Sequence, residues 1–586
     1  NLEKTPGTEK EGFAMSTNVQ EKRWSYPPSP SEEVVRSLSE SLQIAPTLAM
    51  LLAQRGILNF EQARHFFRPS LQDLHSPFLM ADLQKAVDRI LLAIDQEEGI
   101  LVYGDYDVDG TTAVSLVSDY LRRHTQNVET YIPDRYKEGY GLSEAGVRFA
   151  AENGYSVIIA LDCGIKAFQQ SRLARELGID LIIGDHHRPG DTLPDAFAIL
   201  DPKREDCAYP FKELSGCGVG FKLCQGIHEK MGLPFSDLTE YLDLLAVSIG
   251  ADIVPVVGEN RILAHFGMKQ INERPRPAIG HFVKQSKRSV FTITDVVFII
   301  APRVNAAGRI DHGHLAVELL TTQDTLEVKR LAEIIDHHNQ TRREFDQQIT
   351  TEALEMIQSA GEESRRTTVV MSESWHKGVI GIVASRLIEN YFRPTVVFTE
   401  SNGKLAGSAR SVPGFDVYAA LDACSDVLEQ FGGHMYAAGM TLLPERYQEF
   451  KDRFEEVVSS TISDDQLIPE VNVDLKISLS EIDLKFYRIL RQFAPFGPEN
   501  LQPIFSTSGV RVPNGRVRKV GSDGKHLKVT ILDPDTGLTL DGIGFGLGHW
   551  EEILKEGQPF QMAYHVEENE WNGKRSLQLR LVDIKI

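Results

Sequence analysis

The chain has 586 residues, about four times the ~150 residues of a typical domain, so we expect three or four domains. Its 42% hydrophobic and 25% charged residues are typical of a globular protein, and no run of ~20 apolar residues occurs, which excludes a transmembrane helix. The net charge of −21 argues against nucleic-acid binding unless a local basic surface or a bound metal reverses it.

Cysteine usage and the N-terminus indicate the compartment. The five cysteines form no C-x-x-C pair and are odd in number, which favours reduced thiols over a disulfide framework. The first thirty residues have no apolar signal-peptide core. We therefore predict a cytoplasmic protein that contacts no membrane, and we predict a monomer.

In chain order, the pattern of apolar residues changes four times. LAMLLAQRGI (48–57) has the spacing of a helix, and from residue 100 short apolar runs alternate with amphipathic segments, which indicates a parallel α/β sheet. A long helical segment without Gly or Pro precedes a second α/β pattern, and short strands separated by N-G and D-G turns end the chain. The predicted parts are an N-terminal tail with a helical region (1–80), a parallel-sheet domain (81–323), a connector helix (324–360), a second α/β domain (361–465) and an OB-like β-barrel (466–586).

Three carboxylates at alternate positions follow the apolar run ILVYG, namely Asp105, Asp107 and Asp109. Buried without a cation they would repel one another, and such a density of oxygen ligands suits Mg²⁺ or Mn²⁺. An EF-hand loop would need a Glu at its twelfth position, where this sequence has Leu116. The alternative reading is a solvated acidic turn.

Two further predicted strands end in metal-ligand residues. SVIIAL ends at Asp162, and DLIIG ends at Asp185-His186-His187. The carboxyl ends of parallel strands share one edge of a sheet, where α/β proteins place their sites. Asp252, after an apolar helix, offers another carboxylate. A strand-end Asp is often only a helix cap, but several such ends predict a shared metal site.

A second Asp-His-His occurs at 336–338, inside the predicted connector helix. No strand precedes it, and its three side chains project to different sides of a helix. We interpret this copy as a solvated helix face, so the strand-end position of the first copy is the feature that predicts a site.

Four ordered segments, GDYDVDG (104–110), LDCG (161–164), DHH (185–187) and ADIVP (251–255), resemble the motifs of the DHH phosphoesterase family. PRVNAAGR (302–309) and GGHMYAAG (432–439) are similar to a further family motif and to the associated DHHA1 domain. The resemblance covers nearly the whole chain. It implies a DHH parallel-sheet domain joined by a long helix to a DHHA1 α/β domain, with a C-terminal OB-like barrel, as in the family's single-strand-specific 5′→3′ DNA exonucleases.

The resemblance also implies roles for the site residues. Two divalent ions, Mn²⁺ or Mg²⁺, would be held by Asp105, Asp107, Asp109, Asp162, His186 and Asp252. Asp185 would orient an imidazole, and His187 would face the scissile phosphate or the leaving oxygen. Two ions about 3.5–4 Å apart generate a hydroxide at neutral pH and hold the attacking and leaving oxygens, so no separate general base is required.

Phosphate-binding candidates occur on both sides of the predicted connector helix. A lone Arg is more often a surface ion-pair partner, and Gly-Gly is often only a turn. The candidates before the connector are Arg135, Arg303, Asn305 and Arg309; those after it are Ser408, Arg410, Gly432, Gly433 and His434.

The last predicted domain contains a local basic cluster. Six basic residues and one acidic residue lie between Arg511 and Lys528, which gives +5 in eighteen residues. A solvated hairpin is the alternative to a strand-binding surface formed by Arg516, Arg518 and Lys519.

Three functions therefore compete. The first is an exonuclease in DNA repair and recombination that degrades single-stranded DNA to 5′-mononucleotides, with a helicase and a single-strand-binding protein as candidate partners. The second is hydrolysis of short RNA, dinucleotides or pyrophosphate by the same metal core, and the third is an inactive binding scaffold. The intact acidic motifs disfavour the scaffold, and the barrel disfavours a very small substrate.

Overall fold

The computed structural model describes residues 21–310, 312–571 and 574–586; the first twenty residues of the predicted N-terminal tail and the second N-G turn, at 572–573, lie outside this range. Chain contacts divide it into two compact units. The first unit comprises residues 21–25 and Phe345–Asn472, and the second comprises Tyr26–Glu344 and Val473–Ile586. In the described part of the chain no helix is long and apolar enough to cross a membrane, and all five cysteines are buried thiols.

In the second unit, a five-stranded parallel sheet has the strand order β3-β2-β4-β5-β6. Its strands are β2 (Gly99–Gly104), β3 (Val128–Tyr131), β4 (Tyr155–Leu161), β5 (Asp180–Gly184) and β6 (Ala198–Leu200). Helix α4 (Leu83–Asp95) precedes these strands and α8 (Gly216–Lys230) follows them. The helices between them are α5 (Val108–Arg122), α6 (Glu144–Glu152) and α7 (Phe168–Glu176). The predicted alternation of buried strands and helices is confirmed.

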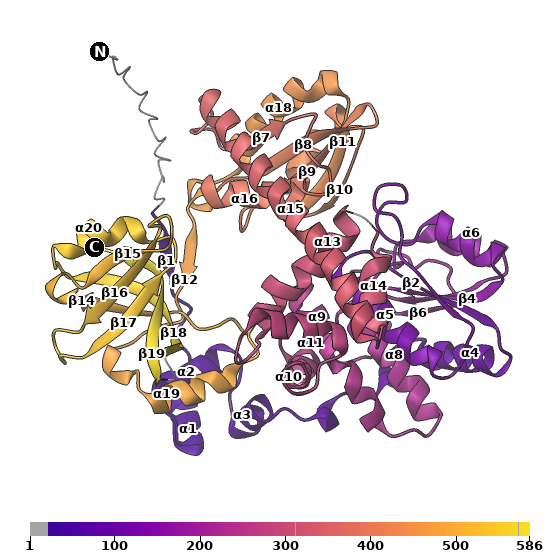
Figure 1. Ribbon diagram of the computed structural model, residues 1–586, viewed down its shortest axis with the longest axis horizontal. Coiled ribbons are helices and arrows are strands. Elements are labelled where there is room, and N and C mark those ends of the chain that lie inside the picture. Colours follow the sequence, from indigo (N-terminus) through magenta and orange to yellow (C-terminus); the bar gives the residue numbers. More distant parts are fainter. Residues whose placement is uncertain (1–20, 311, 572–573) are drawn as a thin grey trace, which may run out of the picture. The chain divides into compact units, whose positions relative to one another are not determined.

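Helices cover both faces of this sheet (Figure 1), which is why its strands are continuously apolar. Val102 and Ile159 point into the core formed with α4, α5 and α8. Leu101 and Ile158, one residue earlier on each strand, point into the opposite core with α6 and α7.

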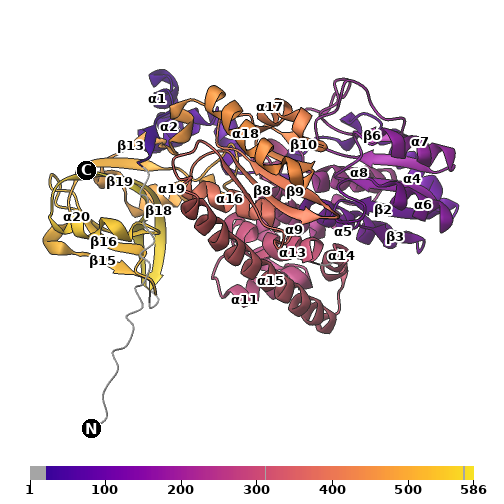
Figure 2. The ribbon, with the colours of Figure 1, turned by 90° about the horizontal axis from the view of Figure 1, so that it is seen from above.

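Mostly helical chain follows the sheet and leads to the connector. Its helices are α9 (Leu242–Ala251), α10 (Gly258–Glu273), α11 (Pro277–Ser286), α12 (Ile293–Asp295), α13 (Ala301–Ile310) and α14 (His314–Thr321). The connector α15 (Thr325–Ser359) is a single long helix, visible end to end in Figure 2. Its residues from Phe345 onward belong to the first unit.

The first unit contains a mixed five-stranded sheet with the order β10-β11-β9-β8-β7, in which only β7 and β8 are parallel. The end of α15 and α16 cover one face, and α17 and α18 cover the other (Figure 2). The elements of the first unit are β1 (Arg23–Ser25), β7 (Thr368–Met371), α16 (Ile380–Asn390), β8 (Thr395–Ser401), β9 (Lys404–Arg410), α17 (Val417–Asp422), β10 (Gln430–His434), β11 (Ala437–Leu442), α18 (Tyr447–Thr461) and β12 (Glu470–Asn472). Strands β1 and β12 form a separate two-stranded sheet.

The C-terminal part of the second unit is a barrel. Its sheet order is β13-β14-β18-β19-β17-β16-β15, and paired hydrogen bonds between Arg511 and Leu532 join the end of β14 to β16, which closes the sheet on itself. The elements are β13 (Leu475–Lys476), α19 (Leu484–Leu490), β14 (Phe505–Val510), β15 (Val517–Val520), β16 (His526–Leu532), β17 (Thr539–Gly544), α20 (Glu551–Lys555), β18 (Phe560–Trp571) and β19 (Lys574–Lys585).

The N-terminal helices pack against this barrel, a pairing that the sequence did not predict. They are α1 (Glu32–Leu42), α2 (Pro46–Gln54) and α3 (Phe60–Phe67). Leu48 and Leu52 of α2 share one hydrophobic core with Phe493 and Phe505, more than 400 residues later. The helical region predicted as a separate N-terminal part therefore completes the C-terminal domain.

Candidate metal centre

Three strands of the parallel sheet bring acidic residues to one edge. Asp105, Asp162 and Asp185 follow β2, β4 and β5, and each residue is at most 1% exposed. His186 lies at the middle of this group, with its Nε2 3.1 Å from Asp162 Oδ1, 3.5 Å from Asp252 Oδ2 and 3.6 Å from Asp109 Oδ2. Residues from four separate sequence segments thus meet at one point.

Asp109 is held by a fixed set of donors. The N–H groups of Gly216 and Cys217, at the start of α8, donate to its two oxygens at 2.6 and 2.8 Å. The Ser248 hydroxyl of α9 donates to Oδ1 at 2.7 Å. Asp107 is the N-cap of α5, since its Oδ1 accepts the Gly110 N–H at 2.9 Å. It therefore caps a helix and also lies beside the acidic cluster around His186.

Asp162 shows that these residues fit a cation. Both of its carboxyl oxygens are buried and accept no hydrogen bond in the described structure, although Oδ1 lies 3.1 Å from His186 Nε2. Asp105 Oδ2 and both His186 ring nitrogens likewise make no hydrogen bond there. Burial, followed by the charges of Asp109 and Asp107, raises the pKa of Asp162 well above its usual range. Its backbone also has φ +58°, a left-handed conformation that costs about 1 kcal/mol or more for a residue with a side chain. Unpaired buried ligand atoms in this arrangement fit divalent ions.

The described residues form two potential ligand groups. Asp162, His186 and His187 make one, and Asp109, His186 and Asp252 make the other, with the ligand atoms of each group within 4.8 Å of one another. His187, which we predicted to face the phosphate, thus also lies among the potential ligands. Asp105 and Asp107 lie beside these groups: the charges of both raise the pKa of Asp162, and the charge of Asp107 also raises the pKa of Asp105. Which residue binds which ion stays a prediction.

Asp185 orients His187. Its Oδ1 lies 2.8 Å from His187 Nδ1, and its Oδ2 accepts the backbone N–H of Ile165 at 2.9 Å. Burial opposes ionisation of both groups, but their hydrogen bond lowers the pKa of Asp185 to about 2 and raises the pKa of His187 to about 9. The imidazole is therefore held as a cation, with 45% of its side chain exposed.

Sequence reasoning missed Asp201, which follows β6 at the same sheet edge. Asp201 is fully buried, its Oδ1 accepts the Lys203 N–H at 2.8 Å, and its Oδ2 has no partner. Burial raises the pKa of Asp201 to about 7. The signal was present, since Asp201 ends an apolar run as Asp162 does, but β6 has only three residues.

Arg135 and Arg309 each contact a tyrosine near the acidic segment that follows β2. The Arg135 guanidinium lies over the Tyr106 ring, 4.9 Å from its centroid, and the Tyr136 hydroxyl donates to the carbonyl of Arg309. Gly308 allows α13 to approach, since a Cβ there would lie 2.8 Å from the Tyr106 carbonyl oxygen. Asn305 lies half-buried on the same helix.

Arg303 has a different environment from the one that we predicted. Its Nε donates to Asp336 Oδ1 at 2.6 Å, and Gln285 donates to the other oxygen of Asp336 at 3.1 Å. The interpretation of Asp336 as a solvated residue is therefore wrong: α15 packs on α11 and α13, and Asp336 provides the polar contact. The second Asp-His-His copy is nevertheless inside a helix, as predicted.

In the first unit, the predicted phosphate-binding residues other than Gly433 lie on one face of the mixed sheet. Ser408 and Arg410 of β9 pair with Gly439 and Ala437 of β11, and these pair in turn with Gly432 and His434 of β10. Arg410 donates to the Ser408 hydroxyl at 3.1 Å. The first turn of α16 lies directly above them, because a Cβ on Gly381 would be 2.9 Å from Ser408 Oγ. Gly433, with φ +150°, lies between Gly432 and His434 and therefore belongs to the opposite face of the sheet.

The basic cluster of the barrel is divided between two faces. Arg518 pairs with Lys528 across β15 and β16, and Arg516 lies exposed just before β15. Lys519 pairs instead with the buried Leu527, and its Nζ lies 3.9 Å from Glu551 of α20. Strand alternation therefore separates Lys519 from the other two predicted residues.

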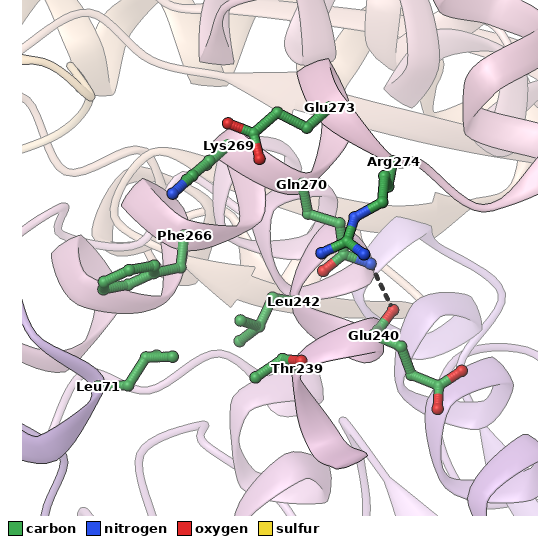
Figure 3. Close-up of a pocket in the computed structure, with 9 residues that line it drawn as sticks. All are labelled: Leu71, Thr239, Glu240, Leu242, Phe266, Lys269, Gln270, Glu273 and Arg274. Carbon is green, nitrogen blue, oxygen red and sulfur yellow. Dashed lines mark hydrogen bonds between the residues drawn. The ribbon is translucent and has the colours of Figure 1, made fainter. Parts of the chain in front are cut away.

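A cavity of 390 Å³ lies elsewhere in the second unit (Figure 3). Leu71, Leu242 and Phe266 line its apolar side, and the Gln270 amide donates to the Glu240 carbonyl at 2.7 Å. None of the predicted site residues lines it, so the metal centre is the stronger candidate site.

The fold and the site together define a class: a DHH phosphoesterase with a DHHA1 domain and a nucleic-acid-binding barrel. Three family models match the chain: the DHH family, N-terminal domain (residues 99–249), the DHHA1 domain (365–460) and the RecJ OB domain (473–583). The chain is 39% identical to single-stranded-DNA-specific exonuclease RecJ of Bacillus subtilis, covering 95% of this chain and 70% of that protein. It is 34% identical to the Escherichia coli RecJ, covering 94% and 98%. The chain belongs to the RecJ family of single-stranded-DNA-specific exonucleases.

Solved structures agree with this membership. The structure is similar to the crystal structure of Thermus thermophilus RecJ in complex with Mn²⁺, with a TM-score of 0.83 and 27% identity over 96% of this chain and 79% of that chain. The Mg²⁺ complex of the same protein gives a TM-score of 0.76 and 25% identity over 96% and 78%. The predicted fold class, with its terminal OB-like barrel, is confirmed.

Proposed function

We propose that this protein is a metal-dependent exonuclease that degrades single-stranded DNA in the 5′→3′ direction and releases 5′-mononucleotides. The observation that carries the proposal is the cluster of buried, unpaired ligand atoms at the sheet edge, in which Asp162 is the most extreme case. The cofactors are two divalent ions, Mn²⁺ or Mg²⁺, which supply a metal-activated water and neutralise charge on the phosphate. The barrel supports a long strand over a dinucleotide as substrate.

The residues of the chain have separable tasks in this reaction. Asp109, Asp162, His186 and Asp252 hold the ions, and the donors around Asp109 fix its carboxylate in place. The cationic His187, oriented by Asp185, lies where it can stabilise negative charge on the phosphate or donate a proton to the leaving oxygen.

The polarity of digestion would come from recognition of the terminal phosphate. Ser408 and Arg410 provide a hydroxyl and a bidentate donor, and the exposed Gly432 leaves backbone accessible beside them. Arg135 and Arg309 provide further positive charge in the second unit. We therefore expect strands with a 5′-phosphate to be preferred over strands with a 5′-hydroxyl group.

A single assay tests the proposal. Single strands labelled at the 5′ or the 3′ end are digested with Mn²⁺, and the order of release and the chemical form of the product are measured. We expect the 5′-labelled mononucleotide to be released first. Asp162→Ala should lose activity while its circular dichroism spectrum stays unchanged. Arg410→Ala should reduce the ratio of the digestion rates of 5′-phosphorylated and 5′-hydroxyl strands. Release from the 3′ end first would refute the polarity, and near wild-type turnover of Asp162→Ala would refute the site.

Three further expectations stay predictions. A helicase and a single-strand-binding protein are the proposed partners, a monomer is the proposed oligomeric state, and the cytoplasm is the proposed compartment. Cross-linking in a cell extract would test the partners, and analytical sedimentation of the purified protein would test the oligomeric state. Cell fractionation would test the compartment.

A further inference from the structure

Asp252 differs from the other proposed ligands in how it is held. It follows a helix, α9, and not a strand, and 25% of its side chain is exposed, whereas Asp109 and Asp162 are almost fully buried. The next residue, Ile253, has φ +59°, which is a strained conformation for a β-branched residue. The position of Asp252 therefore depends on what fixes the turn of residues 252–257.

Part of that support comes from the C-terminal domain. The Val256 N–H donates to the Pro498 carbonyl at 2.8 Å. The neighbouring Gly497 lies so close that a Cβ on it would be 2.3 Å from Val256 Cγ2. Residues 493–500, which we call the clamp loop, lie within the segment that matches the RecJ OB domain. The clamp loop thus contacts the turn that carries Asp252.

The clamp loop is itself rigid. Gly497 and Asn500 exchange two backbone hydrogen bonds, and the Asn500 amide donates to the carbonyls of Phe493 and Pro495 at 2.8 and 2.9 Å. Both sides of Asn500 are satisfied, since its Oδ1 accepts from Arg55 at 2.9 Å. A loop with its polar groups paired in this way can transmit a constraint.

The first turn of α10 joins the clamp loop to the Asp252 turn. The Asn260 amide donates to the Pro255 carbonyl at 3.0 Å, and the next residue, Arg261, donates to the Phe493 carbonyl at 2.8 Å and to the Ala494 carbonyl at 3.2 Å. Arg261 is 5% exposed, and its guanidinium lies over the Phe66 ring, 3.8 Å from the ring centroid. Adjacent residues of one helix therefore hold both segments.

We propose that the clamp loop is a positioning element of the metal centre: Gly497 and Pro498 hold the Val256 backbone and thereby keep Asp252 directed at His186. The OB domain then has a second task besides strand binding, because part of it completes the metal site. This inference rests on the proposed function of Asp252 as a metal ligand. The competing view is that the clamp loop is only a packing contact between two parts of the chain.

The test uses the full chain and measures metal binding directly. Gly497→Ala places a methyl group against Val256, and we expect Mn²⁺ affinity by calorimetry to fall about 10-fold or more, as is typical when support for a ligand is disturbed. The Mn²⁺ concentration for half-maximal hydrolysis of single-stranded DNA should rise in parallel, while kcat at saturating Mn²⁺ changes less. Val256→Ala removes the clashing Cγ2, so the double variant Gly497→Ala/Val256→Ala should regain most of the affinity.

A matched control separates positioning from general destabilisation. Gly537→Ala adds the same methyl to the same domain, at φ +72° and with no atom within 4 Å, so it strains the barrel without touching the Asp252 turn. It should lower the unfolding temperature but leave Mn²⁺ affinity unchanged. Equal loss of affinity in both variants, or no rescue by Val256→Ala, would overturn the inference.

Asp252→Ala distinguishes the two levels of failure. If Asp252→Ala weakens Mn²⁺ binding but Gly497→Ala does not, only the positioning role is wrong. If neither variant changes Mn²⁺ binding, the assignment of Asp252 as a ligand is wrong as well.

Discussion

At the scale of single residues, the metal centre is a set of carboxylates that oppose folding when no cation is present. Burial, followed by the charge of Asp109, raises the pKa of Asp252 to about 8, and the pKa values of Asp105 and Asp162 are raised well above their usual range, first by burial. Each of these groups is easier to ionise in the unfolded chain than in the metal-free folded protein.

The stability of the metal-free protein should therefore depend on pH. A carboxyl with a raised folded pKa contributes stability that is complete below its unfolded pKa of about 3.9 and is lost as the pH rises through the folded pKa. In EDTA we expect the unfolding temperature to fall between about pH 5 and pH 8, because the folded pKa values of Asp201 and Asp252 are about 7 and about 8. His187, with its pKa raised to about 9, adds to the fall above about pH 6.5. Saturating Mn²⁺ should remove most of the part that is due to Asp252. Asp252→Asn should reduce the slope in EDTA.

The same measurement contains its own counter-check. Asp185 has a lowered pKa of about 2, so the stability that it contributes is present above its unfolded pKa and is lost only as the pH falls toward 2. Its titration therefore cannot produce a fall between pH 5 and pH 8. An unfolding temperature that stays level across this window in EDTA would show that the carboxylates are not crowded as described.

At the scale of elements, strand alternation decides which basic residues act together. The sequence places Arg518 and Lys519 side by side, but they project to opposite sides of β15. Arg518 and Lys528 are cross-strand neighbours on the exposed side, while Lys519 approaches Glu551. The predicted +5 segment thus presents fewer charges on one face than its charge count indicates.

Salt titration of strand binding should reveal this division. Each phosphate neutralised on single-stranded DNA contributes about −0.7 to the slope of log affinity against log salt. We expect Arg518→Ala with Lys528→Ala to flatten the slope by about 1.4, and Lys519→Ala to change it less. Hydrolysis of a dinucleotide should be unaffected in each variant. Equal effects of Lys519 and Arg518 would contradict the division between two faces.

At the scale of the whole molecule, residues 26–67 depend on residues that follow more than 400 positions later. Leu52 is fully buried in the core shared by α2 and the barrel. Leu52→Ala should destabilise that core by about 2–5 kcal/mol, as measured by chemical denaturation, and should weaken binding to long strands near the unfolding transition. Leu58→Ala is the control, because Leu58 is 50% exposed and should change stability little. Unaltered stability of Leu52→Ala would argue against the shared core.

Much of the site was predictable because its signals are local. An apolar run buried on both faces predicts a strand of a parallel sheet, and a polar residue at its end is carried to the functional edge, as for Asp162 and His186. Asp201 was not predicted, because a strand of three residues is too short for its apolar pattern to be recognised. The phosphate-binding roles stay predictions. Arg303 shows why such roles are hard to assign from sequence, because its partner Asp336 belongs to a helix face that we interpreted as solvated.

The sequence by itself determined the class of fold, the resemblance to DHH phosphoesterases and the identity of the acidic and histidine residues, because periodicity and strand-end chemistry are written within short windows. Only the tertiary structure decided which distant segments meet. It paired the N-terminal helices with the barrel, directed Arg303 to Asp336, and brought Gly497 against Val256 behind Asp252. Such pairings depend on complementary packing and on the satisfaction of buried polar groups across hundreds of residues, which no local pattern records.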